Sequence, residues 1–190
     1  MPITLNDTTI TGLAANGLPA GSVTATNMYS GAILQVIQTI KTDTWSGGGA
    51  PTTFYPVTGF TANITPQYST SKIMVKVNVV LGSQYWEVQG NLLKNGANLT
   101  ASQGTARSTR LPVTFSAAIT DASGATGYSI FQGTFTYVDT PGNTSPVSYG
   151  ISLNGYSTYG IYVNRSYYDA DVADYYGCPI STITLMEIKA

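Results

Sequence analysis

The sequence predicts an all-β protein, a jelly-roll-like antiparallel β-sandwich with an extended N-terminal arm. Apolar and polar residues alternate in several short segments, which is the two-residue period of strands with one buried face. Turns rich in Gly and Pro separate these segments at fairly even intervals, and no segment shows a convincing amphipathic helix. About eight short strands of this kind form a sandwich, a jelly roll or a small barrel. We favour the jelly roll, although periodicity does not predict strand order.

The clearest predicted strand spans residues 72–81. Its apolar face consists of Ile73, Val75, Val77, Val79 and Leu81. Residues 60–65 and 131–139 alternate in the same way, with apolar faces formed by Phe60, Ala62 and Ile64 and by Phe131, Phe135 and Tyr137. Further strands are predicted over 150–156, 160–165 and 181–188. Residues 32–40 are rich in β-branched side chains and are not expected to be helical.

A hairpin is predicted at Asn95-Gly96, because this dipeptide suits the two positive-φ positions of a tight primed turn. The apolar residues before position 31 follow no such pattern, being irregularly spaced. They are Ile3, Leu5, Ile10, Leu13, Leu18 and Val23. We therefore expect residues 1–30 to form an extended docking arm and residues 31–190 to form one β-sandwich domain.

The arm is expected to bind a neighbouring chain, either by lying in a groove or by adding a strand to a sheet edge. The alternative is a functionless, disordered leader, which is common at chain termini. Disordered tails are usually depleted in Ile and Leu, and this segment is not. The docking interpretation is therefore preferred.

Few residues are charged. The formal net charge is -1 and charged residues make up 9% of the 190, against roughly 25% in an average soluble domain. The basic residues are scattered, which argues against nucleic-acid binding. No run approaches the roughly 18 apolar residues of a membrane span, and no signal peptide is recognised. The single cysteine, Cys178, excludes an intramolecular disulfide and is interpreted as a small buried residue.

Catalytic chemistry is not expected. Histidine is absent, which excludes Ser-His-Asp and Cys-His catalysis and the commonest zinc ligand. Only two glutamates, Glu87 and Glu187, and seven scattered aspartates are present, so paired catalytic carboxylates are not evident. No cofactor is expected.

The densest acidic cluster comprises Asp169, Asp171 and Asp174, and it is a weak candidate for a calcium site. It lacks a turn glycine and a closing glutamate, so a solvated loop is the favoured interpretation.

Tyrosine is unusually frequent, with 14 residues against 5 Phe and 2 Trp. The candidate contact residues in the last third of the chain are Tyr156, Tyr159, Tyr167, Tyr168, Tyr175 and Tyr176. Their rings could pack within the domain, contact another subunit or a capsid, or stack on sugars of a glycan receptor. These interpretations remain open at this stage.

Two parts of the chain resemble small virion structural proteins of tailed bacteriophages, especially cyanophages. Residues 3–23 (ITLNDTTITGLAANGLPAGSV), followed by GAILQVIQT at 31–39, resemble the start of these proteins. Residues 71–82 (SKIMVKVNVVLG) and 181–190 (STITLMEIKA) resemble their β-rich head domain, often described as a tail-fibre or virion structural protein. The resemblance implies a compact β domain, usually trimeric, that is held on a phage particle by its N-terminal segment.

Shaft repeats are absent, which favours a capsid decoration (cement) protein or a small knob over a long fibre. The expected partners are two further copies in a homotrimer and the major capsid protein or another virion structural protein. The expected location is the virion surface, after synthesis in the cytoplasm of the host bacterium. The alternatives are a tail-fibre module that recognises host surface glycans and a cellular lectin that shares the β architecture.

Overall fold

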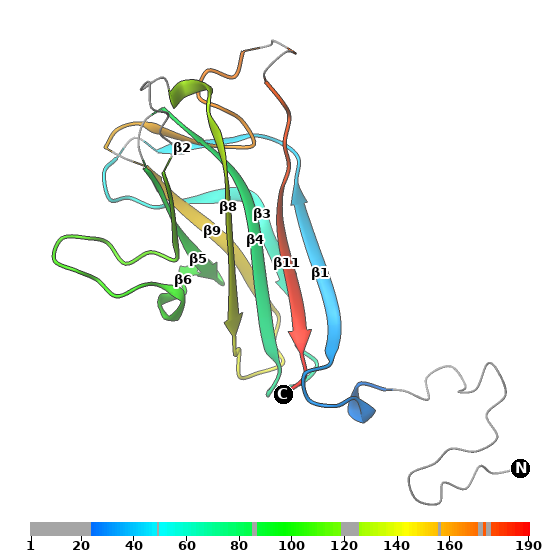
Figure 1. Ribbon diagram of the computed structural model, residues 1–190. Coiled ribbons are helices and arrows are strands. Elements are labelled where there is room, and N and C mark those ends of the chain that lie inside the picture. The colour runs from blue at the N-terminus through cyan, green and yellow to red at the C-terminus, as the bar shows by residue number, and fades with distance from the viewer. Residues whose placement is uncertain are drawn as a thin grey trace, which may run out of the picture.

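The computed structural model describes residues 24–48, 50–84, 87–118, 126–155, 157–170, 173 and 176–190. Within these ranges the protein consists of β-strands and three single-turn 3₁₀ helices, with no α-helix (Figure 1). The strands are β1 (Ile33–Lys41), β2 (Trp45–Gly48), β3 (Tyr55–Ile64), β4 (Lys72–Ser83), β5 (Glu87–Lys94), β6 (Ala97–Asn98), β7 (Phe115–Ala118), β8 (Ile130–Asp139), β9 (Val147–Gly155), β10 (Gly160–Val163) and β11 (Ser181–Ile188). The 3₁₀ helices are η1 (Ala25–Asn27), η2 (Thr100–Ser102) and η3 (Thr126–Tyr128).

The strands form two antiparallel sheets. Sheet A has the order β1-β11-β4-β10-β2, and β8 pairs with the other side of β4. Sheet B has the order β3-β9-β5-β6, with β7 also paired to β5. The long strand β4 accommodates two neighbours on one side, since β11 pairs with residues 72–78 and β10 with residues 81–83. Figure 1 shows sheet A in front of sheet B.

The strand pairing is that of a jelly roll. When the short strands β2, β6 and β10 are set aside, the first of the eight remaining strands pairs with the last, the second with the seventh, the third with the sixth and the fourth with the fifth. These pairs are β1·β11, β3·β9, β4·β8 and β5·β7. Two further pairings, β11·β4 and β9·β5, join them into two sheets. The predicted jelly-roll-like sandwich is therefore confirmed, and the strand order is now known.

The core lies between the two sheets, and its residues follow the predicted alternation. The five apolar residues of the predicted strand 72–81 are fully buried in β4, as are Phe60, Ala62 and Ile64 in β3. Sheet B contributes a facing row from β9 that consists of Val147, Tyr149, Ile151 and Leu153. The predicted face of β8 is only partly confirmed, because Phe135 and Tyr137 pack against the core but Phe131, near the strand end, is exposed.

The predicted hairpin joins β5 to β6. Asn95 and Gly96 have φ angles of 51° and 79°, so both central residues adopt the left-handed conformation of a type I′ turn. The side chain of Asn95 also accepts a hydrogen bond of 2.9 Å from the backbone N–H of Ser148. The turn is thereby attached to the start of β9.

One polar cluster crosses between the sheets at the edge of the core. The hydroxyl of Tyr149 (β9) donates a 2.6 Å hydrogen bond to Oδ2 of Asp139 (β8), and Nζ of Lys94 (β5) lies 2.6 Å from the same oxygen. Burial of the Tyr149 ring, together with its bond to the Asp139 carboxylate, raises the pKa of this phenol well above its usual range. Tyr149 therefore stays protonated and serves as a permanent donor to Asp139.

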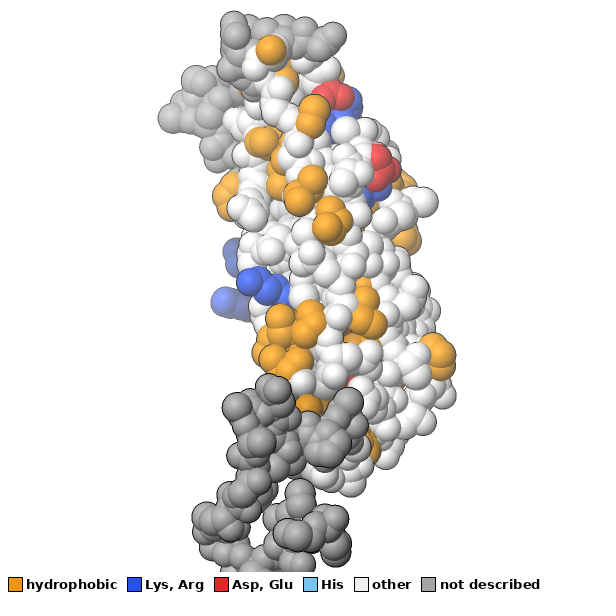
Figure 2. Space-filling view, turned by 90° about the vertical axis from the view of Figure 1, so that its right-hand side faces the viewer, with side chains coloured by type: hydrophobic (Ala, Val, Ile, Leu, Met, Phe, Trp, Pro, Cys, Tyr) orange, Lys and Arg blue, Asp and Glu red, His pale blue; other side chains and the backbone are white. Residues whose placement is uncertain are grey.

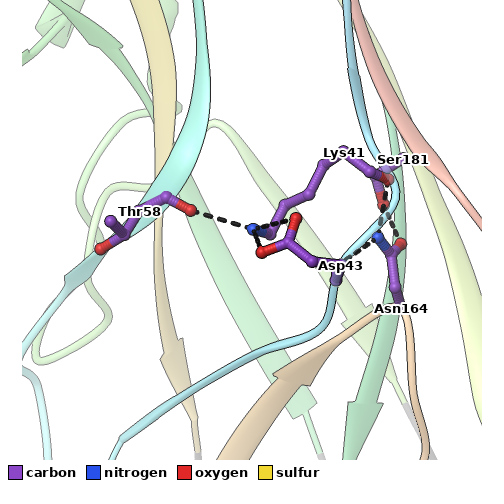
Figure 3. A network of polar contacts seen from close by, with 5 residues as sticks. All are labelled: Lys41, Asp43, Thr58, Asn164 and Ser181. Carbon is purple, nitrogen blue, oxygen red and sulfur yellow. Dashed lines mark hydrogen bonds and ion pairs between the residues drawn. The ribbon is translucent and has the colours of Figure 1, made fainter.

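A second cluster surrounds Lys41, which is 2% exposed at the end of β1 (Figure 3). Its ammonium group donates to both carboxylate oxygens of Asp43, at 3.0 and 2.9 Å, and to the carbonyl oxygen of Thr58 in β3, at 3.0 Å. The hydrogen bond from Lys41 lowers the pKa of the exposed Asp43 carboxyl. Lys41 thus links sheet A to sheet B. Alternation alone would place its positive charge in the core without a partner, but Asp43 and the carbonyl group of Thr58 provide partners for it.

Asn164, which directly follows β10, connects three chain segments beside Lys41. Its Nδ2 group donates to the carbonyl oxygens of Lys41, at 2.8 Å, and Asp43, at 3.0 Å. Its Oδ1 atom accepts from the hydroxyl of Ser181 at 2.6 Å, and that hydroxyl accepts from the N–H of Val80 at 3.0 Å. Because Asn164 and Ser181 are both buried, this side chain holds the ends of β1, β10 and β11 together.

We predict that Asn164→Ala lowers the free energy of unfolding by about 2–4 kcal/mol, because it removes three hydrogen bonds, two of them buried. Urea denaturation measures this loss. Asn63→Ala, at an exposed position of β3, is the control and should change stability by no more than about 0.5 kcal/mol. Equal effects of the two substitutions would show that the Asn164 contacts do not stabilise the fold.

Candidate functional site

Strand β1 is an unprotected sheet edge. It pairs with β11 on one side and with no described strand of sheet A on the other. Exposed edge strands usually carry Pro, outward charges or bulges that prevent pairing with other chains. β1 contains no Pro, its one charged residue, Lys41, is buried, and its bulge lies at its beginning, between Ile33 and Gln35. Among the described residues, no strand pairs with this edge from Gln35 onward, although the side chains of Gln35 and Thr39 donate hydrogen bonds to carbonyl groups of the β3 segment.

The outer side chains of β1 belong to a row of apolar residues. Val36 is 56% exposed and lies opposite Met186 of β11, which in turn lies opposite Met74 of β4. Met74 lies opposite Val138 of β8, which is 43% exposed. These four residues, called the apolar row below, cross the outer face of sheet A from β1 through β11 and β4 to β8. Ile40, 51% exposed, adds a second apolar position on β1.

The surroundings of this edge are nearly uncharged. Figure 2 views the side of the molecule on which β1 lies in Figure 1, and its hydrophobic side chains form separate patches on a mostly uncharged polar surface. On one side of the apolar row the next strand positions are Gln38, Thr184, Lys76 and Thr136, and on the other side they include Ile188 and Lys72, so each side carries one lysine. Little electrostatic repulsion would oppose contact between two copies of such a surface.

The base of the arm lies beside the same edge. The ammonium group of Lys189 donates hydrogen bonds to the carbonyl oxygens of Ala25, Thr26 and Met28 at 3.0, 2.9 and 2.6 Å. The backbone of Lys189 also pairs with Gly31 and Ala32. Residues 24–32 are therefore attached to the end of β11, next to the start of β1. The predicted arm residues Ile3, Leu5, Ile10, Leu13, Leu18 and Val23 lie outside the described residues.

The structure brings part of the predicted tyrosine set together. Tyr167 and Tyr168 have ring centroids 5.0 Å apart, and Tyr128, which the sequence did not single out, lies 4.6 Å from Tyr168 and 6.3 Å from Tyr176. Tyr168 also packs on Gly127, where a Cβ atom would collide with its ring. Tyr128 and Tyr168 are more than half exposed, so this cluster at the η3 end of the sandwich is partly a surface feature. Tyr159 is half-buried, and Tyr156 and Tyr175 lie outside the described residues.

The weak calcium candidate is only partly described. Asp169 forms an ion pair of 2.6 Å with Arg165, while Asp171 and Asp174 lie outside the described residues. Among the residues that the structure describes, no three His, Cys, Asp or Glu side chains are grouped as metal ligands. In the same part of the chain, no helix is long and apolar enough to cross a membrane.

The prediction of a buried Cys178 is wrong. The thiol is free and exposed, because Cys178 lies in the loop before β11 rather than at an inward-facing strand position. The sequence also did not predict Lys189 or the apolar row. Met74 lies on the face of its strand that was expected to be polar. This apolar residue among polar ones was the sequence feature that could have indicated the apolar row.

Comparison with known proteins identifies no family for the chain. No protein-family model matches it, and no curated protein matches it either. Among solved structures, it is similar to VP2 of infectious bursal disease virus in a subviral particle, with 12% identity, a TM-score of 0.36 and coverage of 90% of this chain and 46% of that chain. It is also similar to infectious bursal virus derived T=1 particles, with 14% identity, a TM-score of 0.38 and coverage of 91% and 41%.

A third similar structure, that of the virus's Gx strain, gives 12% identity, a TM-score of 0.35 and coverage of 90% and 47%. The chain thus spans less than half of each of these viral chains. Because the TM-scores are below 0.5, no property of those particles is carried over to this protein. The jelly-roll assignment depends on the strand pairing described above.

We predict that Lys189→Met releases the arm base, because the substitution keeps an apolar stem and removes the three hydrogen bonds to the carbonyl groups. Hydrogen exchange of the backbone N–H groups of Asn27 and Met28, measured by mass spectrometry, should accelerate while that of β1 stays slow. Lys72→Met, on the exposed end of β4, is the control and should change neither rate. Unchanged exchange in the Lys189 variant would mean that the arm base is held by other contacts.

Proposed function

We propose that this protein is a non-enzymatic structural protein of a tailed-phage virion. It acts as a homotrimer attached to the particle surface by its N-terminal arm, either as a capsid decoration (cement) protein or as a small knob. The observation that carries the proposal is the open, uncharged edge formed by β1 and the apolar row, beside which the arm base is attached. The resemblance of residues 3–23 and 181–190 to phage virion proteins supports the same role.

The occupant proposed for the β1 edge is a second copy of the domain. The edge and the apolar row are parts of one continuous surface, so the edge of one copy can contact the row of the next. A head-to-tail contact of this kind closes into a ring when the rotation is one third of a turn. The low net charge of each chain means that three copies can meet without strong repulsion.

In such a ring the arm would be free to bind the surface of the particle. Lys189 attaches residues 24–32 at the end of sheet A where β1 begins, and Figure 1 shows η1 beyond that end. In a ring built on the β1 edges, three arm bases would lie at the same pole. Twenty-three residues precede Thr24, and fully extended they reach about 75 Å. This length could bridge neighbouring capsomers, and binding only the assembled shell would stabilise it.

We predict that the full chain is a trimer by native mass spectrometry and that the double substitution Val36→Lys, Ile40→Lys makes it monomeric. Two charges on an apolar contact surface must be desolvated when the subunits meet, at a cost of several kcal/mol. Asn98→Lys, at an exposed position of β6 in sheet B, lies outside this surface; it is the control and should remain trimeric. A monomeric full chain, or a trimer that survives the β1 double substitution, would contradict this interface.

A second measurement tests the attachment. Removal of residues 1–23 should leave the trimer intact and abolish its cosedimentation with particles of the phage that encodes the protein. Particles that bind the shortened and the full chain equally would refute the role of the arm, independently of the outcome for the trimer.

A further inference from the structure

A groove lies on the outer face of sheet B, on the other sheet from the β1 edge. Its volume is about 850 Å³, within the roughly 300–1,000 Å³ typical of small-molecule sites. Its floor is formed by outward-facing residues of β5 and β9, and its walls by residues 51–52 and by residues 109–113 of the loop before β7. The groove is therefore built by four segments that are distant in the chain.

Two amide oxygens on the floor have no hydrogen-bond donor among the described residues. Gln89 of β5 and Asn154 of β9 lie directly opposite each other in the sheet. The Oε1 atom of Gln89 and the Oδ1 atom of Asn154 are buried and unpartnered, and Asn154 is only 5% exposed. A buried acceptor without a donor costs stability, so two such atoms side by side need an explanation. A ligand that brings its own donors would provide one.

The remaining groups define the chemistry of that ligand. Glu87 adds a carboxylate at the end of β5, and its Oε1 atom accepts from Gln89 Nε2 at 3.3 Å and from the hydroxyl of Ser116. Arg110, on the loop wall, supplies guanidinium donors and balances the charge of Glu87. Leu111 adds an apolar wall beside these polar groups. The groove thus offers several acceptors, a donor and an apolar surface, and the opposite charges of Glu87 and Arg110 leave its lining without net charge.

We infer that this groove binds a neutral saccharide, with the oxygens of Gln89 and Asn154 accepting from sugar hydroxyl groups. A sugar supplies both donors and acceptors at short spacing, and its C–H faces suit the apolar wall. An anion is disfavoured by a floor of acceptors that includes a carboxylate. A hard divalent cation normally takes six to eight oxygens, often from several carboxylates, whereas Glu87 is the only carboxylate among the residues that line this groove, which also include Arg110. The site lies within a single chain, so it does not depend on the proposed trimer.

The test is saturation-transfer NMR with the full chain and a panel of probes. The panel contains glucose, galactose, mannose, N-acetylglucosamine, lactose and maltose, each up to about 50 mM; CaCl₂ alone is titrated separately by calorimetry. At least one saccharide should bind, with signal saturating in the millimolar range or below. If none binds at these concentrations, or if calcium binds and saccharides do not, the inference is wrong.

Variants locate the site. Asn154→Leu and Gln89→Met each remove one unpartnered oxygen and should weaken saccharide binding by at least about tenfold. Asn154→Leu should leave the melting temperature unchanged, whereas Gln89→Met also loses the hydrogen bond to Glu87 and should lower it slightly. Asn63→Leu, at an exposed position on β3 of the same sheet, is the control and should bind like the wild type. Two groove variants are used so that misfolding of one leaves the other informative. Binding unchanged in both folded variants would overturn the assignment of the groove.

Discussion

The pairing of β1 with β11 is the constraint on which the other features of this domain depend. Gln35 and Glu187, which share a hydrogen bond across this pair, are 152 residues apart in the chain. Their pairing closes the jelly roll, makes β1 an edge of sheet A, and aligns Val36 with Met186 in the apolar row. It also places Lys189 beside residues 24–32, the base of the arm. The surface formed by β1 and the apolar row is thus a consequence of how β1 and β11 meet.

Local patterns in the sequence predicted most of the strands. Alternation at 72–81 and 60–65 depends only on neighbouring residues, and the Asn95-Gly96 turn depends on two backbone angles, so both were predictable and are confirmed. The strand order depends on contacts between distant segments and could not be read from periodicity. Lys41 illustrates the limit within one strand, because its burial depends on Asp43 and on the Thr58 carbonyl group of another sheet.

The surface sites were less predictable than the core. Val36 and Ile40 show an outward apolar spacing in the sequence, but the row that continues through Met186 and Met74 requires the register of three strands. The groove was even less predictable from the sequence. Nothing in the sequence around Gln89 or Asn154 marks them as a site, and only the pairing of β5 with β9 places them opposite each other. Cys178 was misassigned for a related reason, since loop position rather than residue type determines its exposure.

The first-with-last pairing also has a consequence during synthesis on the ribosome. β1 emerges early, whereas β11 is made about 140 residues later, which at 5–20 residues per second is a delay on the order of 10–30 s. Until then β1 has no partner strand, and such non-local pairing folds slowly. The row that includes Met186 cannot exist before β11 has been made and has paired with β1. The apolar surface on the outer face of sheet A therefore forms only after β11 has joined the sheet.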